Sequence, residues 1–228
     1  MRLHIPDPNY TTSKRAKSSF VLAIKLGLIF VVIVWASFFF QLLVGPEMTQ
    51  LGLRPRSAEG LLGLLTTPLL HGSFAHLLSN SMPLFIGIVA ILFLYPNSSL
   101  RVLPILYLGS AALAWVFARS SVHIGASGLV YGLLTYVFLA GLLRRDLRSV
   151  VVSLMVWFFY GSMVWGVLPL AERTSWELHA SGFLLGVLTA WVYRDWDRPP
   201  VKKYEWEFED ADPAEGDGPT DRNWPGMH

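Results

Sequence analysis

The strongest constraint in this sequence is a series of long apolar runs that contain very few charged residues. Glycine, proline and charged residues separate six such runs, at 20–44, 74–95, 102–117, 127–143, 149–168 and 178–193. A bilayer core of about 30 Å needs roughly 20 apolar residues in a helix. Hydrophobic residues form 53% of the chain and charged residues 15%, which excludes a disordered or nucleic-acid-binding protein. The sequence therefore predicts an all-α membrane protein with six transmembrane helices in contact with lipid.

The distribution of Lys and Arg predicts the orientation of these helices. With six spans both termini share one side, which holds 13 Lys and Arg residues against four on the other, while Lys25 lies inside the first run. Short basic loops stay in the cytoplasm, so both termini are expected there. The domains are then a cytoplasmic segment 1–19, a six-helix domain 20–193 and a cytoplasmic acidic tail 194–228, for which disorder is predicted.

The first loop on the opposite side, residues 45–73, is unusually long for a compact domain. A loop of this length usually has structure or function of its own. It contains an apolar group, Leu61, Leu62, Leu64 and Leu65. We expect a short helix at the membrane interface here. His123, in the next loop on this side, is interpreted as an interfacial loop residue.

Polar side chains inside the runs are the candidates for chemistry, because they are costly in lipid. The chain has no cysteine, which excludes thiol catalysis and cysteine-ligated metal sites. The candidates lie at the starts of the second, fourth and sixth runs and are His76, Asn80, Ser127, Tyr131 and His179. These three helices run in parallel, so their polar ends meet at the same non-cytoplasmic face.

Glycines favour a close approach of the fourth and sixth helices. Gly125 and Gly128 flank the turn that leads into Ser127, where a helix N-terminus favours an oxyanion. Gly132, Gly182 and Gly186 give the two helices small faces. A serine and a histidine within hydrogen-bond reach form a nucleophile and its general base.

Three motifs together resemble the rhomboid family of intramembrane serine proteases. The run Gly125-Ala126-Ser127-Gly128 resembles the family's GxSG. Residues 71–80 resemble its HxxxxHxxxN, with His71, His76 and Asn80 at the motif positions, and 179–186 resemble its HxxGxxxG. The order of the motifs and the numbering of their helices match a rhomboid-like bundle of the bacterial six-helix type.

The resemblance implies an intramembrane serine endopeptidase that cleaves transmembrane segments of other proteins, without a cofactor or metal. Ser127 is the implied nucleophile and His179 the implied base. His76, Asn80 and the Ser127 backbone N–H are implied to stabilise the oxyanion, and Tyr131 to pack beneath the His179 ring. His71, Gly125, Gly128 and Gly182 are supporting positions. A bacterial inner membrane is the implied location.

The residues themselves favour a dyad over a triad, since no carboxylate lies within an expected span. Glu172 and Glu177 are assigned to a loop. Three aromatic residues of the fifth run, Trp157, Phe158 and Phe159, are candidates to line a lateral gate. The first loop reads Leu-Gly-Leu-Arg-Pro-Arg at 51–56, where some rhomboids have Trp-Arg, so loop details are not transferred.

Other interpretations remain open. Ser127 is alternatively a packing serine in a small-residue interface, and Asn80 a bridge between helices. His71, His76 and His179 are alternatively buried, satisfied histidines or zinc ligands, although HExxH is absent. His71 has either a structural or a secondary catalytic role. The alternative function is a noncatalytic rhomboid-like protein that binds membrane helices.

Overall fold

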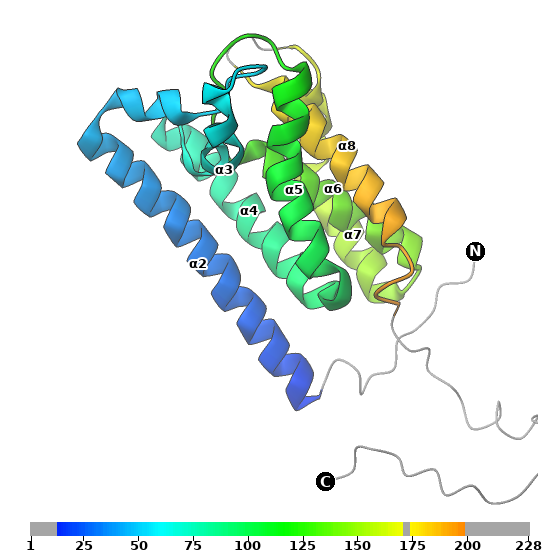
Figure 1. Ribbon diagram of the computed structural model, residues 1–228. Coiled ribbons are helices and arrows are strands. Elements are labelled where there is room, and N and C mark those ends of the chain that lie inside the picture. Colours follow the sequence, from blue (N-terminus) through cyan, green and yellow to red (C-terminus); the bar gives the residue numbers. More distant parts are fainter. Residues whose placement is uncertain (1–12, 171–173, 199–228) are drawn as a thin grey trace, which may run out of the picture.

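Helices form the regular elements of the computed structural model, which describes residues 13–170 and 174–198 (Figure 1). The six long ones are α2 (Lys14–Val44), α4 (Phe74–Leu94), α5 (Pro96–Phe117), α6 (Ser127–Arg144), α7 (Leu147–Tyr160) and α8 (Trp176–Val192). Residues 1–12 and 199–228 are outside the described part. The prediction of a disordered acidic tail therefore lies outside the described residues.

Five segments of the described chain are long and apolar enough to cross a membrane: α2, α4, α5, α6 and Leu147–Val167. The expected sixth span corresponds to α8, whose 17 residues extend roughly 25 Å, slightly less than the core of a typical bilayer. The structure thus confirms an all-helical chain with five candidate spans. The sixth span stays a prediction.

Two helices, α2 and α5, begin six residues earlier than the apolar runs indicate. The helix α2 starts at Lys14 because the Ser13 hydroxyl accepts a hydrogen bond from Ala16 N at 3.1 Å, which caps the first turn. The apolar pattern predicts that Pro96 stops the second run, and α4 does end before it, at Leu94. Pro96 is also the first residue of α5, ahead of the expected start at 102. Proline is favoured at the first helical position because it needs no partner for an N–H.

The start of α5 is tied to the segment that follows α8. The two carboxylate oxygens of Asp197 accept hydrogen bonds from Asn97 N at 2.8 Å and Ser98 N at 3.1 Å. These two N–H groups have no acceptor within their own helix. A residue distant in sequence therefore provides the cap that the apolar pattern does not reveal.

The fifth expected helix, 149–168, is divided in the structure. The α-helix α7 ends at Tyr160, and a 3₁₀ helix, η4 (Gly161–Val167), continues from it. A 3₁₀ turn orients its carbonyls differently from an α-helix.

The long loop between α2 and α4 contains four short helical turns, which confirms the expected short helix. They are η1 (Pro46–Leu51), η2 (Glu59–Leu62), α3 (Gly63–Thr66) and η3 (Thr67–Leu69). Leu61, Leu62 and Leu65 are about half exposed, at 47%, 49% and 56%. The turns therefore present an apolar surface, as the leucine pattern indicated.

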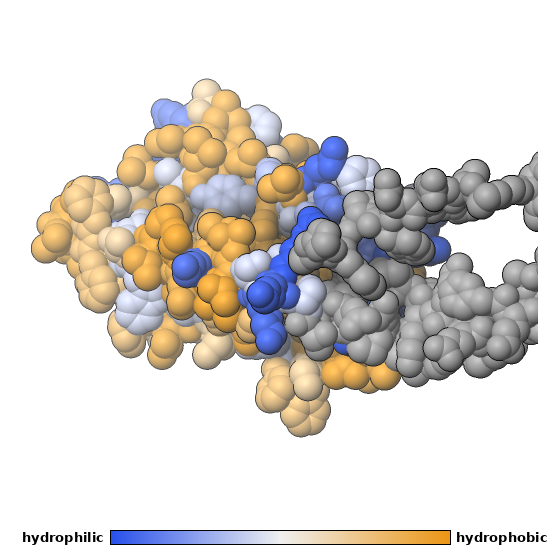
Figure 2. All heavy atoms as spheres, turned by 90° about the horizontal axis from the view of Figure 1, so that it is seen from below, coloured by the Kyte–Doolittle hydropathy of each residue, from blue (hydrophilic) through white to orange (hydrophobic). Residues whose placement is uncertain are grey.

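Large apolar side chains cover the outer faces of the bundle. Leu43 of α2 is 85% exposed and Phe158 of α7 is 81% exposed. Figure 2, seen from below, shows this apolar surface with hydrophilic patches among it. At the end of α8, Arg194 and Arg198 both pair with Asp195. Such extensive apolar exposure is unusual for a soluble monomer and suits a lipid environment.

The helix α6 lies at the centre of the bundle and packs against α4, α5, α7 and α8, whereas α2 packs on α4 at the edge (Figure 1). Glycines bring α6 and α8 into backbone contact. A Cβ placed on Gly182 would lie 1.9 Å from Gly128 O, and one on Gly186 would lie 2.7 Å from Gly132 O. No side chain fits at this crossing.

We predict that Gly182→Ala separates α6 from α8 and destabilises the protein. Overpacking of this kind typically costs about 1–3 kcal/mol in the free energy of unfolding. Thermal unfolding in detergent measures the effect. Gly72→Ala is the matched control, because its Cβ would meet its nearest neighbour, Ile124 Cδ1, at 3.6 Å. Equal unfolding midpoints for the two variants would contradict the close crossing.

Candidate active site

Ser127 and His179 form a hydrogen-bonded pair between α6 and α8. The distance between His179 Nε2 and Ser127 Oγ is 2.8 Å, although 52 residues separate the two along the chain. Ser127 is the first residue of α6, and His179 lies in the first turn of α8. Both side chains are buried. The glycine crossing described above is what allows two helix starts to approach this closely.

The backbone that leads into Ser127 is held on both sides. Gly125 has a φ of 117°, which favours glycine, and its N–H donates to Thr67 O at 2.9 Å. Ala126 N–H donates to His71 Nε2 at 3.4 Å. As the first residue of α6, Ser127 has a backbone N–H without an intrahelical acceptor. This N–H is suited to bind an oxyanion.

His76 packs against the same backbone segment. A Cβ on Gly125 would lie 2.7 Å from His76 Nε2, so the imidazole occupies the space that a side chain would need. The position of His76 follows from the start of α4, where Ser73 Oγ accepts a hydrogen bond from His76 N at 3.1 Å. The structure therefore brings His76 to the turn that precedes Ser127.

Asn80 lies one turn further along α4 and is 6% exposed. Its side-chain nitrogen, Nδ2, is buried and has no hydrogen-bond acceptor among the described residues. An unsatisfied buried donor typically costs about 1–3 kcal/mol. The helix α4 packs against α6, so this unused donor belongs to the helix pair that carries His76 and Ser127.

Two contacts fix the orientation of the His179 ring. Tyr131 stacks on it, with ring centroids 4.2 Å apart and planes 10° apart, as expected for the sequence position of Tyr131. His179 Nδ1 lies 2.9 Å from Gly166 O, so Nδ1 carries the proton that is donated to this carbonyl. Nε2 is then the acceptor for the Ser127 hydroxyl.

Two carbonyls of η4 that the side-chain motifs do not indicate support these rings. Tyr131 Oη donates to Met163 O at 2.8 Å, and Gly166 O accepts from His179. Both groups belong to the backbone, so no side-chain pattern signals them. The glycine at position 166 is a weak sequence signal of these contacts. A Cβ there would lie 1.9 Å from Tyr131 Oη, so only glycine fits.

The assignment of Glu177 to a loop was wrong. Glu177 lies in the first turn of α8, is 6% exposed and pairs with Arg119, with 3.5 Å between Arg119 Nε and Glu177 Oε1. Its Oε1 also accepts a hydrogen bond from Arg119 N, whereas the ring of His179 is oriented by Gly166 O. Glu172, the other carboxylate considered, lies outside the described residues.

His71 is fully buried beneath the turn that precedes Ser127. The side chain of Gln41 holds its backbone, donating to His71 O at 2.7 Å and accepting from His71 N at 3.3 Å. The rings of His71 and His76 meet edge to face with centroids 5.0 Å apart. Burial, together with the nearby His76, lowers the pKa of His71 to about 4, so the ring is neutral at neutral pH.

The zinc alternative requires three ligands in one place. Within the described ranges, no group of three or more His, Asp or Glu side chains is arranged to hold a metal ion. His179 already uses both ring nitrogens, one on Ser127 and one on Gly166 O. The arrangement is therefore better suited to proton transfer than to metal coordination.

An apolar cavity of about 230 Å³ lies beside Tyr131, between α6, α7, η4 and α8. Trp157 lines this cavity and stacks on Phe138 at 5.5 Å. Phe158 and Phe159, by contrast, are 81% and 68% exposed on the outer face. Of the three gate candidates, Trp157 thus lines this cavity although it is 54% exposed, and the gate itself stays a prediction.

The fold and the site define a helical membrane protein with a buried serine–histidine pair at the starts of two helices. The Rhomboid domain family matches residues 58–196, which is more than half of the chain. The chain therefore belongs to the rhomboid family, as its motifs indicated, and it is an integral membrane protein.

Relatives of this chain occur in mycobacteria. Proteins of Mycobacterium tuberculosis and Mycobacterium bovis are each 29% identical to it over 202 residues, covering 81% of this chain and 80% of the relative. A Mycobacterium leprae protein is 29% identical over 158 residues, covering 62% and 59%. All three are described as uncharacterised proteins, so they add no activity.

We predict that His71 makes the fold sensitive to acid. The pKa of His71 is about 4 in the folded protein against 6.5 ordinarily, so between these values the unfolded chain binds more protons. Its contribution to the free energy of unfolding is complete above about pH 6.5 and is lost as the pH falls towards about 4. The unfolding midpoint, measured in detergent across this range, should fall less steeply for His71→Gln. Equal slopes would contradict the assignment.

Proposed function

We propose that this protein is an intramembrane serine endopeptidase that uses Ser127 and His179 as a catalytic dyad. Membership of the rhomboid family supports this proposal. The observation that carries it is the 2.8 Å contact between His179 Nε2 and Ser127 Oγ, together with the Nδ1 contact to Gly166 O that selects the required tautomer. A packing serine does not need an oriented imidazole.

The reaction follows from this geometry. His179 Nε2 takes the Ser127 hydroxyl proton as Oγ attacks the scissile carbonyl, and the carbonyl oxygen becomes an oxyanion. The Ser127 N–H, His76 and Asn80 Nδ2 donate hydrogen bonds to that oxyanion. His179 then gives its proton to the departing amine, which leaves an ester on Ser127. Water, activated by the same histidine, hydrolyses the ester and restores the serine.

The proposed substrates are transmembrane segments of other membrane proteins. Six spans, with α8 as the sixth, form the catalytic domain 20–193, and both termini lie in the cytoplasm at a bacterial inner membrane. The Lys and Arg distribution supports this orientation. It places the Ser127–His179 pair near the non-cytoplasmic surface, where water reaches the ester more readily than at the middle of the bilayer.

We predict that a small serine-reactive phosphonate labels Ser127 in the detergent-purified protein. Ser127→Ala and His179→Ala should each abolish labelling, because the first removes the nucleophile and the second removes its base. Mass spectrometry of the intact protein and of its peptides locates the adduct.

Ser110→Ala is the matched control, since Ser110 is a buried serine whose hydroxyl donates to its own helix at Tyr107 O. It should label as the wild type does. Equal labelling of wild type and Ser127→Ala would exclude the dyad. An unlabelled but folded wild type would instead favour the noncatalytic alternative, a protein that binds membrane helices.

We predict a smaller effect for Asn80→Ala. Loss of one oxyanion donor elsewhere slows catalysis by roughly 10²–10³-fold, and His76 compensates in part. The rate of phosphonate labelling should therefore fall, with the adduct still on Ser127. Ser79→Ala is the control, because the Ser79 hydroxyl is exposed and donates to His76 O at 2.9 Å. An unchanged rate for Asn80→Ala would remove Asn80 from the oxyanion site.

A further inference from the structure

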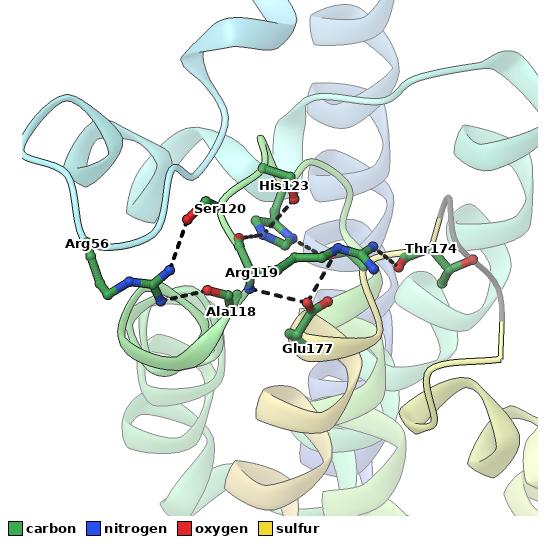
Figure 3. Close-up of polar contacts among 9 residues, drawn as sticks. Arg56, Ala118, Arg119, Ser120, His123, Thr174 and Glu177 are labelled. Atoms are coloured by element: carbon green, nitrogen blue, oxygen red, sulfur yellow. Dashed lines mark hydrogen bonds and ion pairs between the residues drawn. The ribbon is translucent and has the colours of Figure 1, made fainter.

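A polar network joins the loop that precedes Ser127 to the start of α8 (Figure 3). Its centre is the pair of Arg119 and Glu177. Glu177 Oε1 lies 3.5 Å from Arg119 Nε and accepts a hydrogen bond from Arg119 N at 3.3 Å. Arg119 Nη2 also donates to Thr174 O at 2.7 Å. A single arginine thus contacts both the side chain and the backbone at the start of α8.

His123 provides a second connection between the same two segments. Its Nδ1 contacts the Ser175 hydroxyl, and its Nε2 lies 3.0 Å from Arg119 O and 3.1 Å from Ser121 Oγ. Its backbone pairs with Leu53 of the long loop through two hydrogen bonds of 2.9 Å. His123 is only 2% exposed. His123 lies in the loop between α5 and α6 as predicted, and these contacts bury its ring. Its place at a membrane interface stays a prediction.

Arg56 holds the other end of this loop. Its guanidinium donates to Ala118 O at 2.7 Å and to Ser120 Oγ at 3.2 Å (Figure 3). Ala118 follows the last residue of α5, where helix carbonyls lack intrahelical partners. The loop from α5 to α6 is thus fixed at its beginning by Arg56, so a contact from α8 acts on a supported segment.

The network lies close in sequence to both reacting groups. His123 precedes Ser127 by four residues, and Glu177 precedes His179 by two. The glycine crossing joins α6 and α8 along their length, whereas these side chains join the segments that lead into them. Productive geometry generally has to be held within about 0.5 Å. The ion pair and the hydrogen bonds between these two segments, called the tie below, restrict the distance between Ser127 Oγ and His179 Nε2.

Stability alone is a weak reason for this ion pair. The Glu177 side chain is 6% exposed, and its second oxygen, Oε2, has no hydrogen-bond partner among the described residues. Removing a carboxylate from water is costly, and the Arg119 side chain is 43% exposed, so solvent weakens its attraction to Glu177. A charged pair at this place is better explained by the geometry that it imposes.

We propose that Glu177 and Arg119 are positioning residues that hold the start of α8 against the loop leading to Ser127 and so keep His179 within reach of the Ser127 hydroxyl. Neither side chain contacts the substrate. This inference rests on the proposed protease function for its catalytic consequence, but the physical tie between the two segments is independent of it.

Hydrogen–deuterium exchange tests the tie directly in the full-length protein in detergent. Glu177→Gln keeps the shape of the side chain and an acceptor for Arg119 N, but removes the charge. It should accelerate amide exchange at 119–126 as well as at the start of α8. Glu59→Gln is the matched control, because Glu59 forms an exposed pair with Arg54, with 3.7 Å between the charged atoms. It should leave exchange in both segments unchanged.

Phosphonate labelling tests the consequence for the site. In Glu177→Gln, the maximal labelling rate of Ser127 should fall by roughly tenfold or more, as expected for a small misplacement of reacting groups. The probe concentration at half-maximal rate should stay unchanged. Arg119→Met also removes the hydrogen bond to Thr174 O, so its effect should be at least as large. Adding Glu177→Gln to Arg119→Met should slow labelling little further, because the ion pair is already absent.

The outcomes separate the two proposals. Unchanged amide exchange at 119–126 in folded Glu177→Gln overturns the tie, whether or not the phosphonate labels the wild type. Altered exchange with a wild-type labelling rate overturns the positioning role. Independent, multiplying effects of the two substitutions also overturn it. Absence of labelling in the wild type contradicts the protease function, and the exchange measurement still decides the tie.

Discussion

The backbone contact between α6 and α8 is the constraint on which the rest of the site depends. The space between Gly182 and Gly128 O admits no Cβ, so the two helices meet without intervening side chains. Lipid tails are as apolar as a helix surface, so close packing of backbones is a main source of helix association in membranes. Here the same contact brings the starts of both helices together and leaves Ser127 and His179 at hydrogen-bond distance. Stability and site geometry therefore arise from one set of glycines.

Around this contact, the protein uses its backbone for tasks that soluble serine hydrolases give to side chains. The carbonyl of Gly166 orients His179 where a triad would use a carboxylate. A neutral carbonyl is less costly to bury than a charged group, which suits a site within a membrane protein. The turn before Ser127 is also held through main-chain groups, with Gly125 N–H on Thr67 O and Ala126 N–H on the neutral ring of His71. The charged pair of Arg119 and Glu177 instead connects the loop before α6 with the start of α8.

The sequence predicts the helices and the central residues well because both follow from patterns of side chains. Long apolar runs mark the spans, and three short motifs bring Ser127 and His179 to parallel helix starts. The features that the sequence does not predict share a different cause. Pro96 begins α5 because Asp197, about a hundred residues away, caps it, and no local pattern reveals such a partner. Gly166 O and Met163 O act through the backbone of η4. Glu177 is assigned to a loop because its charge interrupts the apolar run, whereas Arg119 makes a helical position for that charge acceptable.

The division of the fifth helix has a wider consequence. The two carbonyls that hold Tyr131 and His179 belong to η4, the direct continuation of α7. The helix α7 buries Ser149, Ser153 and Val156 and leaves most of its large apolar side chains exposed. A displacement of α7 would carry η4 with it and release the proton of His179 Nδ1 from Gly166 O. The orientation of the His179 ring is thereby coupled to the packing of a peripheral helix, because Gly166 O belongs to the segment that continues α7.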